Sequence, residues 1–222
     1  MPIKIRKKIK GLLTAGGTGG HIYPLLAVGD WLRDIGEGEI RLAYAGQVGS
    51  FRSEFEDRYM SAYPILPSKI RRYFSLLNFL DVPIFFFSML QAIFWVFVVM
   101  PDVVFSKGGP GTLAVILAAR FYRIPVVIHE SDAIPSVTNR VSSRFAARVG
   151  VSFQNTMKEF PKEKVFFSGN PLREELMKDW VAQFSAKTYF KLSAEDPVVL
   201  VLGGSQGSLR INNFILDNLV PL

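Results

Sequence analysis

The segment LLTAGGTGGHIYP, residues 12–24, decides the fold of this chain. An apolar run ends there in four glycines and a threonine, and a helical pattern follows almost at once. Glycine allows conformations and close approaches that other residues do not, and a helix N-terminus presents unpaired N–H groups at the positive end of its dipole. The segment therefore predicts a strand, a phosphate-binding loop and a helix. A glycine-rich turn with a purely steric role is the alternative.

The spacing of these glycines excludes two common phosphate-binding motifs. The dinucleotide fingerprint G-x-G-x-x-G requires a glycine where this chain has Ile22. The next apolar run, residues 40–45, is not followed by an acidic residue that would bind a ribose. A Walker loop ends in Gly-Lys-Ser/Thr, and no such tripeptide follows the segment. The loop is therefore of another kind, and it contains a histidine, His21.

Composition and charge restrict the class of protein. The chain has 222 residues, of which 49% are hydrophobic, so it can hold one large domain, or one domain and part of another. A formal net charge of +7 suits an anionic surface, either phospholipid or nucleic acid. No stacked aromatic platform or helix-turn-helix pattern supports nucleic acid. The absence of cysteine excludes disulfides and thiolate metal ligands, which fits a cytoplasmic protein.

Short apolar runs alternate with helix-length segments along the chain. The expected strands are 9–15, 40–45, 62–66, 103–106, 126–129, 149–152 and 165–167. The expected helices are 22–34, 50–59, 84–99, 112–122 and 136–145. This alternation predicts an α/β fold, a Rossmann-like parallel sheet with helices on both faces. Ligands of such sheets bind beyond the C-terminal strand ends, where the chain has the loops 16–21, 107–111 and 130–135.

A second glycine-rich turn, residues 203–207, follows the apolar run 198–202 and repeats the arrangement of the N-terminus. We therefore expect a second Rossmann-like domain to begin here. One strand and one helix cannot bury a core of their own, so the chain is expected to be cut off after the first strand–helix unit of that domain. The expected divisions are an N-terminal domain, a helical linker and the start of a C-terminal domain, at residues 1–172, 173–196 and 197–222.

Residues 82–100 form an uncharged, strongly aromatic run that as a helix is long enough to span a bilayer. Contact with the membrane interface, a plain core helix and a true span all remain open. A span would put strands of one sheet on opposite sides of the membrane, which argues against it. Basic and aromatic residues that suit lipid headgroups precede the run: Lys69, Arg71, Arg72, Tyr73 and Phe74.

Five motifs occur in an order that resembles the MurG family of peptidoglycan glycosyltransferases. They are GGTGGH at 16–21, PDVV with KGG at 101–109, IPVVIHE with TNR at 124–140, GNPLR at 169–173, and GGSQG with Ile211-Asn212 at 203–212. Each motif alone is weak, but the five together extend from about residue 9 to the end. The resemblance implies two Rossmann-like domains of the GT-B type, of which this chain holds the N-terminal domain and the start of the C-terminal one.

The resemblance also implies an activity. The family transfers N-acetylglucosamine from UDP-N-acetylglucosamine to the muramoyl-pentapeptide carried on a polyprenyl diphosphate, with inversion and with no metal or cofactor. Its N-terminal domain binds the acceptor and touches the cytoplasmic face of the cell membrane, and its C-terminal domain holds the nucleotide sugar. The expected partners are therefore these two substrates and an anionic inner-leaflet surface, without nucleic acid.

The resemblance assigns roles to particular residues. His21 is expected to be the general base on the acceptor hydroxyl, or to stabilise the leaving diphosphate; a helix-capping histidine is the alternative. Glu130 is expected to orient the acceptor, or to cap the following helix. His129 is expected to pack at the strand ends, with proton transfer as the other possibility. Substrate contacts are expected from Thr18, Gly19, Gly20, Asp132, Asn139, Arg173 and Ser205.

Two departures from the family pattern affect these expectations. Asp132 occupies the position of a substrate-binding asparagine, which puts a carboxylate near phosphates and either alters the sugar contacts or requires a nearby cation. The second glycine loop is shorter, because Gly108-Gly109 leads directly into Pro110-Gly111. Two other functions stay open: the acceptor-binding membrane subunit of a split transferase, and a non-catalytic module that binds anionic lipid.

Overall fold

The computed structural model describes residues 8–68, 78–178, 183–204 and 207–219. The chain divides after Glu174 into two compact units, which we call unit 1 (residues 1–174) and unit 2 (residues 175–222). Each unit is described by itself. The linker and donor-domain assignments made from the sequence for residues 173–222 stay predictions.

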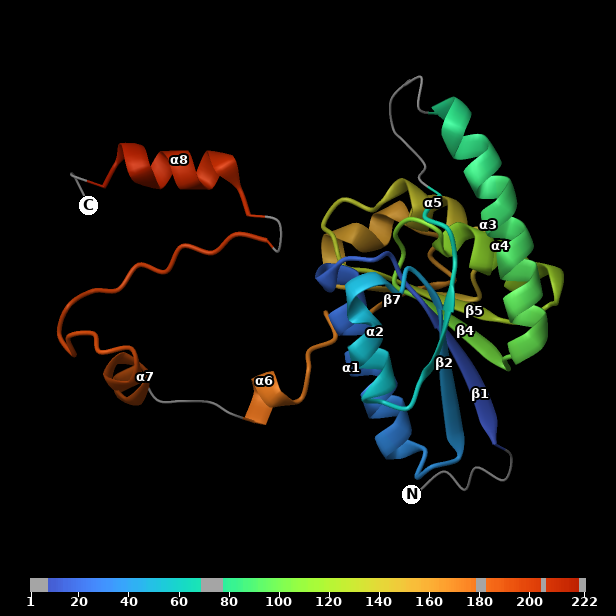
Figure 1. Ribbon diagram of the computed structural model, residues 1–222, viewed down its shortest axis with the longest axis horizontal. Coiled ribbons are helices and arrows are strands. Elements are labelled where there is room, and N and C mark those ends of the chain that lie inside the picture. Colours follow the sequence, from blue (N-terminus) through green and yellow to red (C-terminus); the bar gives the residue numbers. More distant parts are fainter. Residues whose placement is uncertain (1–7, 69–77, 179–182, 205–206, 220–222) are drawn as a thin grey trace. The chain divides into compact units, whose positions relative to one another are not determined.

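Unit 1 is built on one sheet of seven parallel strands (Figure 1). The strands are β1 Ile9–Thr14, β2 Ile40–Gly46, β3 Ser61–Pro64, β4 Val103–Ser106, β5 Val126–Glu130, β6 Arg148–Val151 and β7 Val165–Phe167. Their order in the sheet is β3-β2-β1-β4-β5-β6-β7. This order confirms the predicted Rossmann-like fold, and β4 and β7 have the predicted bounds.

Helices cover both faces of the sheet (Figure 1). The helices of unit 1 are α1 Gly19–Ile35, α2 Arg52–Glu56, α3 Asn78–Val99, α4 Thr112–Phe121 and α5 Val137–Ser142, with 3-10 turns η1 Gly49–Phe51 and η2 Gln154–Glu159. The first helix begins at Gly19, earlier than predicted, because the extended backbone of Thr18 already forms its N-cap. The helix predicted at 50–59 is instead η1 followed by the short α2, and Tyr59 adopts a positive φ of 48° beyond it.

The core has two layers because successive strand residues point to opposite faces. Leu12 packs with Val104 and Ile128 on the face covered by α3 and α4. Leu13 packs with Leu42 on the other face, in the cluster that includes α1. Both layers bury nearly continuous apolar strands, as a parallel sheet requires. Packing on both faces of the sheet therefore fixes the positions of the strand ends and of the loops that follow them.

Tyr44 connects the core to the glycine-rich loop. Its ring is fully buried and stacks on Phe55 of α2, with 4.2 Å between the ring centroids. Its hydroxyl donates a hydrogen bond of 3.0 Å to the carbonyl of Ala15. Burial raises the pKa of Tyr44 above its ordinary value, so the hydroxyl keeps its proton and remains a donor. This bond fixes the point where the chain leaves β1.

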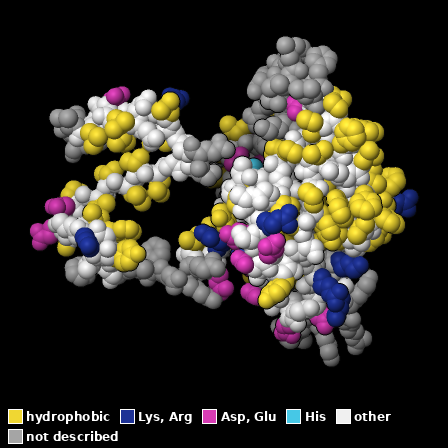
Figure 2. All heavy atoms as spheres, in the orientation of Figure 1, with side chains coloured by type: hydrophobic (Ala, Val, Ile, Leu, Met, Phe, Trp, Pro, Cys, Tyr) yellow, Lys and Arg dark blue, Asp and Glu magenta, His cyan; other side chains and the backbone are white. Residues whose placement is uncertain are grey.

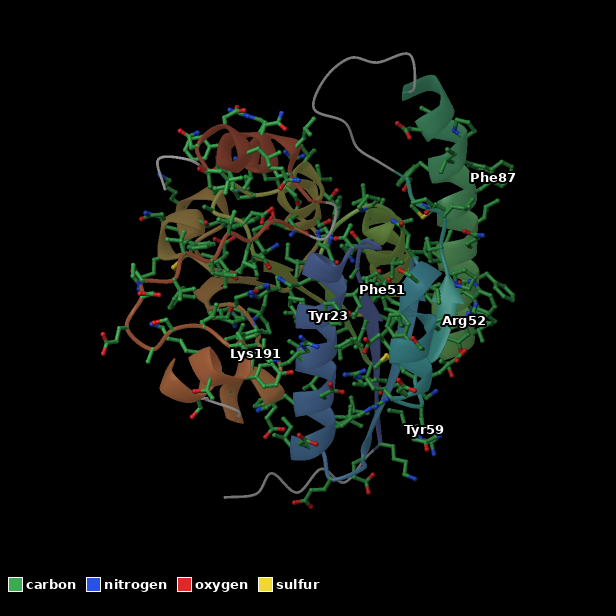
Figure 3. All side chains as sticks on the ribbon, turned by 60° about the vertical axis from the view of Figure 1, so that its left-hand side comes forward. Tyr23, Phe51, Arg52, Tyr59, Phe87 and Lys191 are labelled. Atoms are coloured by element: carbon green, nitrogen blue, oxygen red, sulfur yellow. The ribbon has the colours of Figure 1, made fainter. Side chains whose placement is uncertain are left out.

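α3 crosses from β3 back to β4 and packs along α4. Its buried stripe includes Ser88, Ala92 and Val96, whereas its outer face leaves large apolar side chains exposed. These are Val82, Phe86, Phe87, Leu90, Phe94, Phe97 and Val98, and we call them the α3 outer face. Figure 2 shows hydrophobic side chains gathered over this helix, and Figure 3 shows Phe87 pointing away from the sheet.

The length and composition of α3 would suffice to cross a membrane, with a mean hydropathy of 2.2 over Asp81–Val99. Only 17% of that stretch is buried, so it is not an ordinary core helix. The strands before and after α3 belong to one sheet. The helix is therefore a crossover of the sheet with one apolar face uncovered. Residues 69–74, which the sequence placed at lipid headgroups, lie outside the described residues.

Unit 2 contains three short helices, α6 Glu175–Lys178, α7 Gln183–Tyr189 and α8 Leu209–Asp217. The prediction of a strand at 198–202 is wrong: this stretch forms no strand ladder, and its side chains are exposed. An extended segment needs a neighbour to receive its backbone hydrogen bonds, and the described part of unit 2 contains no strand. The helix expected after the second glycine-rich turn is present as α8, capped by Ser208.

Candidate functional site

The candidate site lies between β1 and β4, where the direction in which successive strands are added to the sheet reverses. β1 leads outward to β2 on one side, and β4 leads outward to β5 on the other. In open α/β sheets, ligands bind beyond the C-terminal strand ends at this switch point. Here the loops after β1 and β4 are joined by two backbone bonds, from Gly16 N to Gly108 O at 2.8 Å and from Lys107 N to Thr14 O at 2.9 Å.

Some of the loop glycines are required by packing, and one is not. Gly109 has a φ of 100°, and a Cβ there would lie 2.8 Å from the Cα of Gly16. A Cβ on Gly17 would collide with Gln47. A Cβ on Gly20, by contrast, would meet nothing within 4 Å. The steric interpretation therefore explains Gly16, Gly17 and Gly109 but leaves Gly20 unexplained.

His21 lies in the first turn of α1, against the two loops. Its Nδ1 is 2.8 Å from the hydroxyl oxygen of Thr18, and a Cβ on Gly16 would come within 3.3 Å of the same nitrogen. Thr18 is the N-cap residue of α1, and the contact of His21 with its hydroxyl lies in the first turn, so the capping role and the role as base both stay predictions. No hydrogen-bond partner for Nε2 occurs among the described residues.

Burial lowers the pKa of His21 below its ordinary value, and the ammonium of Lys107 lowers it further, against the opposite effect of Asp132 and Glu130. The imidazole is therefore neutral near pH 7. A neutral ring with one nitrogen held by a hydroxyl and the other unpartnered can accept a proton.

His21 borders a cavity of about 150 Å³. The cavity is lined by Gly20, His21, Lys107, Glu130, Ser131, Asp132, Ser136 and Asn139. Five residues that the sequence named thus come together here, from α1, β5, α5 and the loop between the last two. Within the described part of the chain, no three His, Asp or Glu side chains form a group that could hold a metal ion.

Glu130, at the end of β5, organises the loop that follows it. One carboxylate oxygen accepts the N–H of Asp132 at 2.9 Å. The other accepts the N–H of Ser136 at 2.9 Å and the amide of Asn139 at 3.0 Å. Ser136 in turn caps α5 by accepting the N–H of Asn139. Both oxygens of Glu130 therefore already have donors from its own loop.

Asn139, which lines the cavity, has one buried acceptor without a partner in the described part of the structure. Its amide nitrogen donates to the carbonyl of His129 and to Glu130. These two acceptors fix which end of the side chain is nitrogen. Its Oδ1 is buried and has no hydrogen-bond partner within the described part of the structure. A buried unsatisfied acceptor costs free energy unless a donor reaches it, and a ligand hydroxyl would supply one.

Arg173 is anchored to the helix that bears the histidine. Its guanidinium carbon lies 4.7 Å from the ring centroid of Tyr23, a cation–π contact. Tyr23 also meets Phe51 of η1 edge-on, with centroids 5.9 Å apart, and Figure 3 shows the two rings side by side. Gly19 begins the same helix. Ser205 lies outside the described residues.

Sequence reasoning missed Lys107 as a site residue. Its side chain is only 2% exposed, and its ammonium lies 2.8 Å from His129 Nδ1 and also contacts the hydroxyl of Ser131. Burial lowers the pKa of Lys107 to about 8. The available signal was its position directly after a buried strand at the ligand-binding edge. The partner histidine is 22 residues away, which the motif does not reveal.

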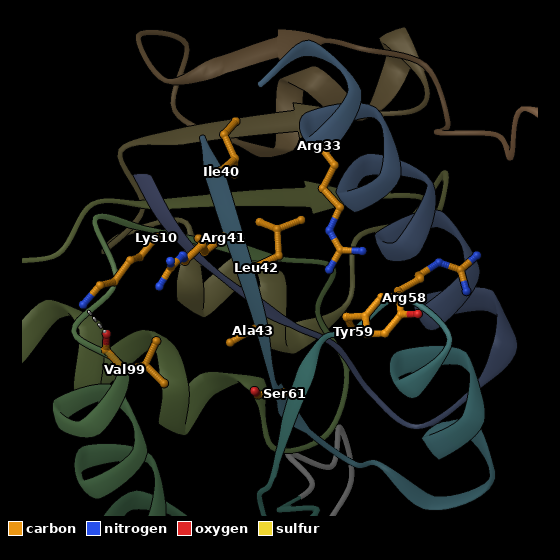
Figure 4. Close-up of a pocket in the computed structure, with 11 residues that line it drawn as sticks. Lys10, Arg33, Ile40, Arg41, Leu42, Ala43, Arg58, Tyr59, Ser61 and Val99 are labelled. Atoms are coloured by element: carbon orange, nitrogen blue, oxygen red, sulfur yellow. Dashed lines mark hydrogen bonds between the residues drawn. The ribbon is translucent and has the colours of Figure 1, made fainter. Parts of the chain in front are cut away.

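A second, larger cavity of about 500 Å³ lies at the opposite ends of β1 and β2 (Figure 4). Its lining is basic, with Lys10, Arg33, Arg41 and Arg58. Arg58 is already paired with Asp30 and Glu54. Because ligands of parallel sheets bind at the C-terminal strand ends, the smaller cavity is the candidate site.

The family of the chain follows from comparison with known proteins. Residues 12–151, which run from within β1 to the end of β6 and include the residues that line the smaller cavity, match the glycosyltransferase family 28 N-terminal domain. The chain belongs to this family. Unit 1 is thus the family 28 domain, and its two glycine-rich loops at the switch point lie inside the matched range.

Curated relatives of this family 28 chain carry one name. The chain is 35% identical over 217 residues to UDP-N-acetylglucosamine--N-acetylmuramyl-(pentapeptide) pyrophosphoryl-undecaprenol N-acetylglucosamine transferase 3 of Bacillus thuringiensis, covering 97% of this chain and 60% of that protein. It is 36% identical over 218 residues to the corresponding Clostridium botulinum transferase, covering 96% and 58%. The chain thus spans about 60% of the length of these relatives.

Solved structures support the same fold. Acinetobacter baumannii MurG matches with a TM-score of 0.59 and 28% identity, over 77% of this chain and 47% of that one. The UDP-GlcNAc 2-epimerase of Neisseria meningitidis, solved with UDP-GlcNAc, matches with a TM-score of 0.56 and 19% identity, over 76% and 49%. The second likeness shows the fold alone.

Proposed function

We propose that the family 28 chain supplies the acceptor-binding and proton-accepting side of an N-acetylglucosaminyltransferase. The donor is UDP-N-acetylglucosamine and the acceptor is a muramoyl-pentapeptide on a polyprenyl diphosphate, as in the names of the curated relatives. The observation that carries this proposal is His21, a neutral imidazole with an unpartnered Nε2 at the mouth of a polar cavity.

The reaction is a direct displacement at the anomeric carbon. The acceptor hydroxyl oxygen bonds to that carbon while the bond to UDP breaks, and the hydroxyl proton passes to Nε2 of His21. With Nδ1–H donating to Thr18, Nε2 holds the lone pair that this step needs. In this tautomer the hydroxyl of Thr18 accepts from Nδ1–H, and Nε2 faces the acceptor as the basic nitrogen.

The N-terminus of α1 stabilises the phosphate groups. Its unpaired N–H groups and its dipole favour negative charge, and the open space at Gly20 lets a ligand approach the backbone. Arg173, held over Tyr23, supplies a planar fork for phosphate oxygens. Gly19 and Ser205 belong to the same proposed contact set.

The cavity holds the sugar side of the acceptor. The unpartnered Oδ1 of Asn139 accepts from one hydroxyl, and the exposed carboxylate of Asp132 accepts from another. Glu130 orients the acceptor indirectly, by fixing the loop that bears Asp132. The alternative role of Glu130, capping the helix that follows, stays a prediction beside this one.

The α3 outer face attaches the protein to the cytoplasmic face of the cell membrane. A contiguous apolar face of this size marks a surface that meets lipid or another protein. A lipid-linked acceptor requires the enzyme to work at the bilayer, and the aromatic composition of the face suits the interface. The net charge of +7 adds attraction to anionic headgroups.

The test is a chimaera in which this chain is followed by the part of the Bacillus thuringiensis relative that lies beyond the matched region. Transfer of labelled N-acetylglucosamine to the muramoyl-pentapeptide lipid is measured for the chimaera, for this chain alone and for the unmodified relative. We expect the chimaera to be active and His21→Ala to lower its rate at least about 100-fold.

Each other result has a definite meaning. An inactive chimaera beside an active relative contradicts the proposed substrates. An active His21→Ala chimaera contradicts the role of His21 as base. Acceptor binding without transfer in any form would favour the non-catalytic lipid-binding module.

A further inference from the structure

We propose that Lys107 is a positioning residue, whose buried ammonium places a positive charge at the cavity that His21 borders and anchors, through His129, the turn that leads to Arg173. This inference rests on the proposed role of His21 as a base. It concerns a buried cation that the proposed reaction does not otherwise use.

The hydrogen bonds of His129 decide its tautomer. Nε2 lies 2.9 Å from the carbonyl oxygen of Gly169, and a carbonyl can only accept. Nε2 therefore carries the proton, and Nδ1 is an acceptor for the ammonium of Lys107 at 2.8 Å. Burial, together with the charge of Lys107, lowers the pKa of His129 to about 4. The ring is neutral at physiological pH and cannot act as a second cation.

This chain of bonds joins three loops. Lys107 follows β4, His129 and Ser131 lie at the end of β5, and Gly169 lies in the turn after β7. The hydroxyl of Ser168 reinforces the last link, 3.1 Å from His129 Nε2. Arg173 follows that turn within the same unit. The buried ammonium of Lys107 thus connects the turn at Gly169, through His129, to the cavity that Lys107 lines.

The same ammonium sets the charge around His21. The described charged groups that act on the imidazole are Lys107 after β4, Glu130 at the end of β5 and Asp132 in the following loop. Without Lys107, His21 would share the cavity with two carboxylates and no cation, and both would favour a protonated ring. Lys107 is the cation that Asp132 calls for in place of the family asparagine.

The chain contains only two histidines, His21 and His129. A pH titration of the two imidazoles by NMR, in the full 222-residue chain, therefore reads both functions of Lys107 without ambiguity. In Lys107→Met we expect the pKa of both histidines to rise, each by about one pH unit. In Asp132→Asn we expect the pKa of His21 to fall and that of His129 to stay, because Asp132 acts on His21 but not on His129.

Ser131→Ala is the matched control, since it disturbs the same cluster and removes no charge. If general loosening were responsible, Ser131→Ala would raise the pKa values of both histidines as Lys107→Met does, and the proposal would be overturned. It would also be overturned if Lys107→Met moved neither histidine. Should Lys107→Met not fold, Lys107→Gln is titrated in its place, because it also removes the charge, and unmoved histidines in that variant would overturn the proposal.

The NMR titration tests the role of Lys107, and the chimaera assay tests the proposed substrates, so one can be contradicted without the other. Shifts as expected with an inactive chimaera would contradict the proposed substrates and leave the assignment of Lys107 intact. An active chimaera with unmoved histidines would contradict the assignment of Lys107 alone.

Discussion

His129 illustrates how a single buried side chain couples protonation to folding. The folded ring has a pKa of about 4, whereas in the unfolded chain it has the ordinary value of 6.5. Between these two values the unfolded chain binds a proton that the folded chain does not. Lowering the pH through this window therefore destabilises the fold, and the stabilising contribution of a neutral His129 is complete above about pH 6.5.

We predict that the free energy of unfolding of the parent falls between pH 6.5 and pH 4 by on the order of 2–3 kcal/mol more than that of His129→Gln. Urea denaturation at pH 7.0 and pH 4.5 measures this difference. The comparison with the variant removes the contribution of the carboxylates, which titrate in both proteins. Equal losses in the two proteins would show that His129 is not neutral in the fold.

The loop glycines separate packing from ligand access. Gly109→Ala places a Cβ against Gly16 at a positive φ, so we expect it to lower the free energy of unfolding by about 2 kcal/mol or more. Gly20→Ala meets open space inside α1, so it should preserve stability or raise it by about 0.5–1 kcal/mol. Denaturation of both variants measures this contrast. In the chimaera, Gly20→Ala should instead raise the KM for substrate.

Among the helices and strands, α3 has two faces with different roles. The inner face, with Ala92 and Val96 fully buried, packs on the rest of unit 1. The outer face leaves Phe87 and Phe94 more than half exposed. Substitutions on the two faces should therefore have separable effects. Removing an exposed ring changes what the helix can meet, and removing a buried methyl changes how well it packs.

We predict that Phe87→Ser combined with Phe94→Ser weakens binding to vesicles containing anionic phospholipid by at least tenfold, with little change in stability, because about 0.8 kcal/mol is lost for each buried CH₂ group removed. Val96→Ala is the matched control: it should lower the free energy of unfolding by about 2 kcal/mol and leave vesicle binding unchanged. Vesicle sedimentation and urea denaturation measure the two effects. Unchanged sedimentation of the double variant would remove α3 from the proposed membrane contact.

The sequence predicts helices and strands better than it predicts which residues contact one another. The runs 103–106 and 165–167 coincide with β4 and β7 because a buried parallel strand is apolar throughout and bounded by turn residues. The equally apolar run 198–202 forms no strand, since a strand also needs a neighbour that the pattern does not contain. Likewise, the motifs point to His21 and Asn139 as site residues. Lys107 is recognised as a site residue only from its burial and its contact with His129, which is distant in the sequence.

At the scale of the whole molecule, the two units differ in how they are stabilised. Unit 1 has a seven-stranded sheet and two core clusters. In the described part of unit 2, α8 has no buried residue, and residues 195–204 are exposed without helix or strand. Local opening of a segment becomes easier as its buried apolar contacts decrease.

We therefore predict that brief trypsin digestion of the full chain yields a resistant product that ends near Glu174, while the exposed Lys191 is cut early. Mass spectrometry of the products at successive times measures this. The NMR signals of His21 and His129 should be unchanged in the product, since every described partner of the two rings lies in unit 1. Early cutting within residues 100–170 would contradict the division into units.

The close approach of Gly16 and Gly109 has a consequence for the history of this site. Their backbones meet with no room for a side chain on Gly109, and a Cβ on Gly16 would lie 3.1 Å from the Cα of Gly109. A gene that acquired a larger residue at one codon would have to lengthen or redirect the opposite loop in the same lineage. We therefore expect substitutions in the two loops to be coupled, although about ninety residues of chain separate Gly16 from Gly109.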